Sequence, residues 1–182
     1  MKDKIISLLY KTEKAGIVDL ISHMEDGGFF EAPCSGSFHL AKEGGLAEHS
    51  MNVYRTMFIL NEMLGAEIAE SSLVICGILH DLGKMGDHGK PNYVPNFLKS
   101  GKVSETKPWE TNKNLLYVPH EIRSIVIAER FIPLTEDEEF AILYHNGMYS
   151  DLKYAYSGKE TPLALILHFA DMWCARVTEV GK

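Results

Sequence analysis

A histidine and an aspartate stand next to each other, His80-Asp81, at the end of an apolar run that is typical of a buried helix. Burying a carboxylate in such a place is unfavourable unless a cation compensates its charge. A divalent metal ion binds a neutral imidazole and an ionised carboxylate together, so the pair indicates a metal site. Four more candidate ligands stand where a helix can aim them inward: His49, His120, His145 and Asp171.

The composition favours a folded domain. The chain has 182 residues, of which 46% are hydrophobic, so it is long and apolar enough to bury a core. No apolar run reaches the roughly 18 residues that a membrane-spanning helix needs. The charged start of the chain does not resemble a secretory signal, and the expected location is cytoplasmic. The cysteines are odd in number and widely spaced, which favours reduced thiols: Cys34, Cys76 and Cys174.

The charge balance argues against one class of partner. The net charge is −7, from 18 basic and 25 acidic residues, and there is no Lys/Arg-rich tract. Binding to duplex nucleic acid depends on neutralising phosphates with basic side chains, so we expect no such binding. A local basic pocket for a small phosphorylated molecule is compatible with this balance.

Apolar residues recur at helical spacing through most of the chain, so we expect an all-α fold in a single domain over residues 1–182. Gly65 is expected to end one helix, and Thr135 to Glu138 to cap the start of another. The expected helices cover approximately residues 5–9, 17–27, 46–64, 66–80, 120–131, 135–145 and 161–178.

Two segments between the helices are expected to determine the substrate. Residues 86–119 contain several prolines and asparagines and predict a long loop or a small hairpin over the core. Residues 148–160 predict a polar loop. Three aromatic residues in the first segment are candidates for stacking on a base, although loop aromatics often pack beneath the loop instead: Tyr93, Trp109 and Tyr117.

The spacing within the pair suggests how it binds metal. Consecutive residues on a helix point about 100° apart, so His80 and Asp81 approach an ion from two directions. The second oxygen of Asp81 is then free to bridge to a neighbouring ion about 3.5–4 Å away. Inward ligands that converge from several helices are how helical bundles build such two-metal sites.

The order of these residues resembles the HD-domain metal-dependent phosphohydrolase superfamily, over about residues 38–178. Leu79 to Lys84 is similar to its signature segment, Gly44 to Ser50 to its first-histidine segment, and Ala170-Asp171 to its last ligand. His120 and His145 fall where the binuclear branch of that superfamily adds two histidines. The resemblance therefore implies one helical HD domain, with residues 1–37 as an N-terminal helical lead-in and residues 38–178 as the metal-binding core.

The resemblance also implies a ligand set. His49, His80, Asp81 and Asp171 would hold one divalent ion, and Asp81, His120 and His145 would hold a second. Taken alone, His120 also suits the start of a helix, and His145 suits the negative end of a helix dipole. Ligation by imidazole and carboxylate without thiolate suggests Mn, Fe, Co, Ni or Zn.

These ligands predict a phosphohydrolase or phosphodiesterase that acts through a metal-activated water on a nucleotide or a similar small phosphorylated molecule. Asp81 and Lys84 are the predicted catalytic residues. Lys84, Arg123 and His88 are the predicted substrate contacts, with a solvated surface position as the alternative for Lys84 and His88. Two other functions compete with hydrolysis: a non-catalytic HD module that binds a nucleotide or a protein partner, and a di-iron oxygenase.

Overall fold

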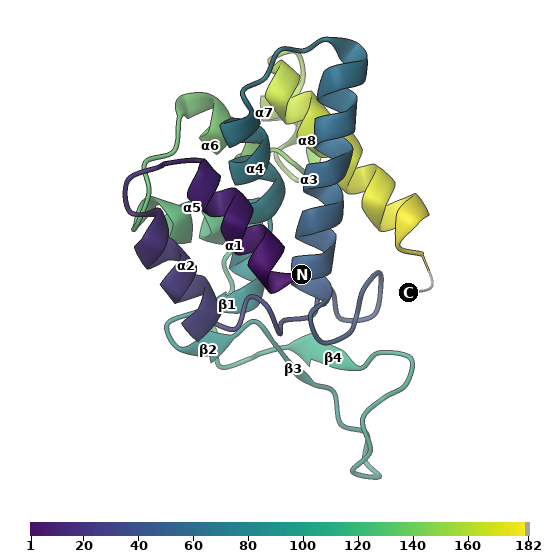
Figure 1. The fold of residues 1–182 in the computed structure, drawn as a ribbon. Helices are drawn as coiled ribbons and strands as arrows, with labels where there is room; N and C mark the ends of the chain where they lie inside the picture. Colours follow the sequence, from purple (N-terminus) through teal and green to yellow (C-terminus); the bar gives the residue numbers. More distant parts are fainter. Residues whose placement is uncertain (181–182) are drawn as a thin grey trace.

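The computed structural model describes residues 1–180, so the last two residues of the predicted domain lie outside it. The described chain is mainly helical, as predicted, with two short antiparallel strand pairs (Figure 1). The helices are α1 Lys2–Lys11, α2 Ile17–Asp26, α3 Gly45–Leu64, α4 Glu70–Leu79, α5 His120–Glu129, α6 Glu136–Leu143, α7 Lys153–Tyr156 and α8 Pro162–Trp173.

One hydrophobic core connects these helices. Buried side chains of α1 and α2, such as Leu9 and Leu20, join the same cluster as those of α3, α4, α6 and α8. α3 and α8 lie side by side along the molecule, and α4 packs against α3 (Figure 1). Cys76 and Cys174 belong to this core, in agreement with a packing role. Among the described residues, no helix is long and apolar enough to cross a membrane.

The helix boundaries differ from the predicted ones at several ends. α4 begins at Glu70 rather than near Ala66, because the Asn61 side chain binds both backbone groups of Ile68 and holds the connection in a non-helical course. α6 begins as predicted, with reciprocal bonds between Thr135 and Glu138, but it ends at Leu143. α8 continues as one π-helical segment, Cys174–Thr178.

The predicted loop 86–119 contains two small hairpins. Strands β1 Gly86–Asp87 and β2 Lys90–Pro91 form the first, and β3 Tyr93–Pro95 and β4 Trp109–Thr111 form the second. The second hairpin projects from one end of the bundle (Figure 1). The predicted loop 148–160 begins within a 3₁₀ turn, Gly147–Tyr149, and contains the short helix α7.

An ion pair anchors the first hairpin to α5. Arg130, at the end of α5, donates to both carboxylate oxygens of Asp87, at 2.8 and 2.6 Å. These bonds from Arg130 lower the pKa of Asp87 from 3.8 to about 2. Because the pKa of Asp87 is lower in the folded state, the ion pair stabilises the fold at pH values above the ordinary pKa of 3.8. This contribution is lost as the pH falls through about 2.

We expect Asp87→Asn to lower the free energy of unfolding by about 2 kcal/mol at neutral pH, since a charged, bidentate bond is lost. Denaturant unfolding of both proteins across pH 2 to 7 measures the difference, which should shrink as the pH falls below about 4. A difference that stays constant down to pH 2 would show that the ion pair is not its source.

Candidate metal centre

The structure brings the six predicted ligands together, although they come from five separate segments. His49 lies in the first turns of α3, and Asp171 lies in α8. His80 and Asp81 follow the end of α4 and precede a 3₁₀ turn, Leu82–Met85. His120 is the first residue of α5, and His145 follows α6 by two residues.

Two glycines allow the close approaches that bring these residues together. A side chain at Gly77 in α4 would meet the Cα atom of Tyr54 at 2.7 Å. Because Gly77 has none, α4 packs closely against α3, and His49 and His80 come into contact. A side chain at Gly83 would collide with the carbonyl oxygen of His120. Gly83 therefore lets the turn after Asp81 lie against the start of α5.

The two oxygens of Asp81 face two different groups of side chains. Oδ2 lies 3.6 Å from His49 Nε2 and 3.4 Å from His80 Nε2. On the same side, Asp171 Oδ1 lies 3.1 Å from His49 Nε2. Oδ1 faces the other way and lies 3.2 Å from His120 Nε2 and 3.6 Å from His145 Nε2.

The tautomers of these histidines follow from their second ring nitrogens. His80 Nδ1–H donates to Gly77 O, and His145 Nδ1–H donates to Ile142 O, so a proton is required at each Nδ1. His49 Nδ1 and His120 Nδ1 lie 2.9 and 3.1 Å from the carboxylates of Glu179 and Glu121. All four rings therefore turn Nε2 toward the Asp81 carboxylate.

Ring nitrogens of this cluster face each other in two close pairs. The Nε2 atoms of His49 and His80 are 3.3 Å apart, and those of His120 and His145 are 3.2 Å apart. Two lone pairs that face each other at such distances repel unless a proton or a metal ion lies between them. The buried oxygen Asp81 Oδ1 also has no hydrogen-bond partner among the described residues. The converging nitrogen and oxygen atoms therefore fit divalent metal ions, which imidazole and carboxylate ligands bind through their lone pairs.

The pKa values of two of these histidines are shifted in opposite directions. Burial and the neighbouring His80 lower the pKa of His145 to about 3, so its ring is neutral and keeps its Nε2 lone pair. Burial lowers the pKa of His49, but Cys34, Asp171 and Glu179 outweigh burial and raise it well above its ordinary value. The pocket thus favours a positive charge at His49, carried either by a proton on the ring or by a metal ion bound in its place.

Lys84 lies at the edge of the same cluster. Its Nζ donates to Asp81 Oδ2 at 2.6 Å, because residues three apart in the 3₁₀ turn share a face. Burial lowers the pKa of Lys84, but Asp81 outweighs burial and raises that pKa above its ordinary value. Lys84 is therefore a cation held beside the predicted bridging carboxylate.

Sequence reasoning did not identify Glu179, which supports His49 from behind. Its buried carboxylate accepts from His49 Nδ1, from His39 Nδ1 at 2.8 Å and from Asn52 Nδ2 at 2.9 Å. His39 and Cys34 also lie close to His49, within 4.8 Å of one another by their donor atoms. Nothing in the spacing of Glu179 relates it to the ligand pattern, so the contact is visible only after folding.

We expect Glu179→Gln to weaken metal affinity about 10- to 100-fold, because the carboxylate that orients a ligating imidazole also makes it more basic. Competition with a fluorescent chelator measures this affinity. Glu138→Gln is a matched control, because Glu138 is equally buried but binds Lys14 and Thr135 away from the cluster. Equal metal affinities for the two variants would contradict the orienting role.

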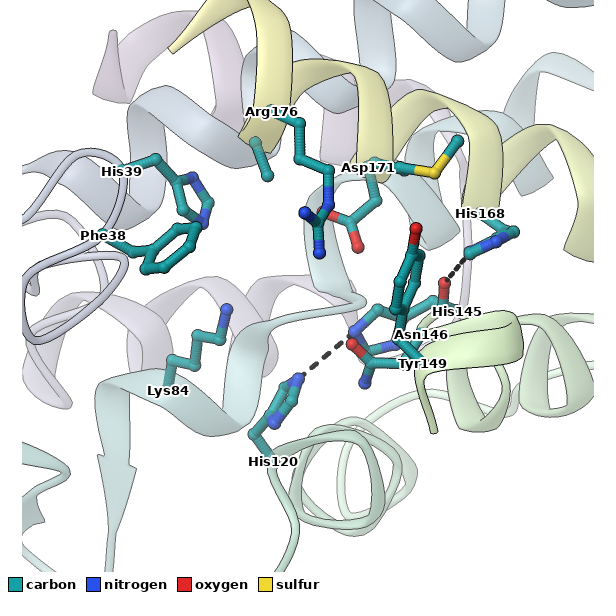
Figure 2. A pocket seen from close by; sticks show the side chains of 12 residues that line it. Phe38, His39, Lys84, His120, His145, Asn146, Tyr149, His168, Asp171 and Arg176 are labelled. Carbon is teal, nitrogen blue, oxygen red and sulfur yellow. Dashed lines mark hydrogen bonds between the residues drawn. The ribbon is translucent and has the colours of Figure 1, made fainter. Parts of the chain in front are cut away.

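A cavity of about 200 Å³ opens over the cluster. Figure 2 shows Lys84 and His120 on one side and Asp171 on the other, with Arg176 reaching into the space between them. His168 donates from Nδ1 to the backbone oxygen of His145 at 2.8 Å, so it supports that histidine from outside.

The other two predicted substrate contacts lie outside this cavity. Arg123 is buried, and its guanidinium donates to Leu116 O at 2.7 Å, so it holds the segment that precedes His120. His88 lies in the first hairpin with 71% of its side chain exposed and contacts Asp87. Arg123 and His88 therefore contact residues of the segment 86–119, here called the insertion, rather than the cluster.

Residues 46–175 match the HD domain family, and this match covers most of the chain. The chain therefore belongs to the HD-domain family. Dihydroneopterin 2',3'-cyclic phosphate phosphodiesterase of Methanocaldococcus jannaschii is 34% identical to it over 91 residues. That match covers 46% of this chain and only 34% of the length of the relative. No solved structure matches the chain.

Proposed function

We propose that this protein is a metal-dependent phosphohydrolase that cleaves an ester or anhydride bond of a nucleotide or a similar small phosphorylated molecule. The observation that carries the proposal is the Asp81 carboxylate, with each oxygen facing its own pair of imidazole Nε2 atoms. Membership in the HD-domain family and the partial likeness to a phosphodiesterase support it.

In this proposal, His49, His80, Asp81 and Asp171 hold one divalent ion, and Asp81, His120 and His145 hold the other. Mn, Fe, Co, Ni and Zn all suit these nitrogen and oxygen donors. Bound in pairs, such ions lower the pKa of a water and neutralise charge on phosphoryl oxygens.

The protein itself contributes position and charge. Carbonyl and carboxylate oxygens beside Nδ1 hold the four imidazoles in one tautomer, so the donor atoms need no rearrangement when substrate arrives. Lys84, protonated and beside Asp81, directs a positive charge at a phosphate that binds over the cluster. Asp81 and Lys84 are therefore the proposed catalytic residues.

The first test combines elemental analysis with an activity assay. Protein purified without chelator should contain about two transition-metal ions per chain, and it should hydrolyse bis(4-nitrophenyl) phosphate and some nucleotides. Removal of the ions should abolish hydrolysis, and Mn, Fe, Co, Ni or Zn added back singly should identify which of them restores it.

Other outcomes would contradict the proposal in distinct ways. A protein that binds metal but hydrolyses no phosphate ester with any of the five ions would favour a non-catalytic binding module. An iron-loaded protein that consumes dioxygen and leaves the esters intact would favour an oxygenase. One bound ion per chain would remove His120 and His145 from the ligand set.

A further inference from the structure

Two cavities, rather than one, meet at the Asp81 cluster. The first, here called the C-terminal cavity, is the 200 Å³ space lined by Phe38, Tyr149 and Arg176 among others. The second, here called the insertion cavity, has a volume of about 140 Å³. Its lining comes from the segment between α4 and α5, and includes Tyr93, Thr111, Leu115, Leu116, Tyr117 and Val118.

Lys84 and His120 line both cavities and therefore form the boundary between them. Lys84 Nζ contacts one oxygen of Asp81, at 2.6 Å, and His120 Nε2 lies 3.2 Å from the other. A phosphate held between Lys84 and His120 would therefore lie where the two cavities adjoin.

The insertion cavity is suited to an uncharged group. Apart from the shared Lys84 and His120, every residue that lines it is neutral. Tyrosine hydroxyls, the Asn92 amide and Thr111 offer hydrogen bonds, while leucine and valine side chains supply apolar surface. A sugar or an aromatic ring has this combination of surfaces.

The C-terminal cavity has a different character. The Arg176 guanidinium lies 4.7 Å from the centre of the Tyr149 ring. Phe38 stands at the opposite wall, and Arg176 extends between the two aromatic side chains (Figure 2). Aromatic faces and a guanidinium together bind a planar ring or an anionic group.

We infer that the substrate is a phosphodiester with two separate substituents on one phosphorus, one substituent in each cavity. This inference rests on the proposed function and narrows it. It excludes as the best substrate a monoester, which has one substituent, and a cyclic ester whose two ester oxygens belong to one sugar.

The reaction this implies is a simple hydrolysis. The oxygen of a water molecule forms a new bond to phosphorus, and the bond from phosphorus to one substituent oxygen breaks. That substituent leaves as an alcohol with one proton from the water. The other substituent stays on the phosphate as a monoester.

A pair of chromogenic esters tests the inference. Bis(4-nitrophenyl) phosphate and methyl 4-nitrophenyl phosphate carry the same charge and the same leaving group, and they differ only in the size of the second substituent. The values of kcat/KM are compared for metal-loaded wild type and for variants of each cavity, after division by the uncatalysed rate of each ester.

Tyr117→Ala and Tyr93→Ala change the insertion cavity, and Tyr149→Ala changes the C-terminal cavity. Tyr154→Ala is a matched control, because Tyr154 is 86% exposed, about as much as Tyr117 at 85%, and lines neither cavity. Thermal unfolding verifies that each variant is folded. Loss of one stacked ring lowers affinity about tenfold.

We expect variants of both cavities to lower kcat/KM for the bis-ester about tenfold, while the methyl ester is affected by variants of one cavity only. Calorimetry supplies a second readout without turnover. Diphenyl phosphate should bind about 100-fold more tightly than dimethyl phosphate, and Tyr117→Ala should reduce this advantage about tenfold, because it changes one of the two cavities only.

Two results would overturn the inference while leaving the proposed function intact. One is a wild type that hydrolyses both esters with a bis-ester rate that is insensitive to Tyr93→Ala and Tyr117→Ala. The other is equal loss for both esters in the variants of both cavities, which would indicate general damage to the metal centre. A folded, metal-loaded wild type that hydrolyses neither ester nor any nucleotide would overturn the proposed function and the inference with it.

Discussion

Replacement of Asp81 by asparagine should lower the hydrolysis rate at least about a thousandfold and remove most of the bound metal, because one residue serves both halves of the cluster. Each of its oxygens faces a different pair of imidazoles. An amide keeps the shape of the side chain but loses the charge, and its nitrogen has no lone pair to offer a metal ion. Elemental analysis and the rate on bis(4-nitrophenyl) phosphate measure both effects.

The control for this variant is Asp87→Asn. Asp87 is also a buried aspartate with cationic partners, but it lies in the first hairpin, where Arg130 binds it. We expect the control to lose stability while it keeps its metal content and its rate. An Asp81→Asn protein that retains full metal content and full rate would contradict the central position of Asp81.

Replacement of His120 by alanine should lower the metal content from about two ions per chain to about one and reduce the rate about 100-fold or more. His120 Nε2 faces Asp81 Oδ1 and His145, whereas His49, His80 and Asp171 lie on the side of Oδ2. The group around Oδ2 therefore keeps all its donors in this variant.

His88→Ala is the matched histidine control. Its side chain is largely exposed and lies outside both cavities, so metal content and rate should match those of the wild type. Two ions retained in His120→Ala would contradict the assignment of His120 to a second ion. A large loss of rate in His88→Ala would restore the predicted contact of His88 with substrate.

Local sequence signals were sufficient to predict where most helices lie and which residues could bind metal. The apolar run before His80 predicts a buried helix, and α4 is buried over most of its length. Pro162 and Thr161 predict a helix start, and the Thr161 hydroxyl accepts from Ala164 N. Such signals depend on residues a few positions apart, so they can be recognised without the fold.

Lys84 and Arg123 have equivalent positions in the sequence but make different contacts in the structure. Each stands three residues after a predicted ligand, Asp81 and His120 respectively. Lys84 contacts Asp81, but the long side chain of Arg123 turns to the carbonyl of Leu116. Equal spacing therefore led to different outcomes, because the surrounding segments decide which acceptor a flexible cation reaches.

The aromatic residues of the insertion divide in the same way. Tyr93 and Tyr117 line the insertion cavity, whereas Trp109 donates from its indole nitrogen to Ala41 O and from its backbone N–H to Gly36 O. All three were equivalent candidates in the sequence. Which of them faces the cluster depends on the register of the second hairpin and on the path of residues 112–118 toward α5.

By itself, the sequence determined the helical class, the family resemblance and six candidate ligands, because these follow from spacing along one helix or one short motif. Only the tertiary structure decided that the two oxygens of Asp81 face different histidine pairs, that Glu179 supports His49, and that two cavities meet at Lys84 and His120. The contact of His49 with Glu179 joins residues 130 positions apart, and the close approaches at Gly77 and Gly83 depend on how whole helices pack.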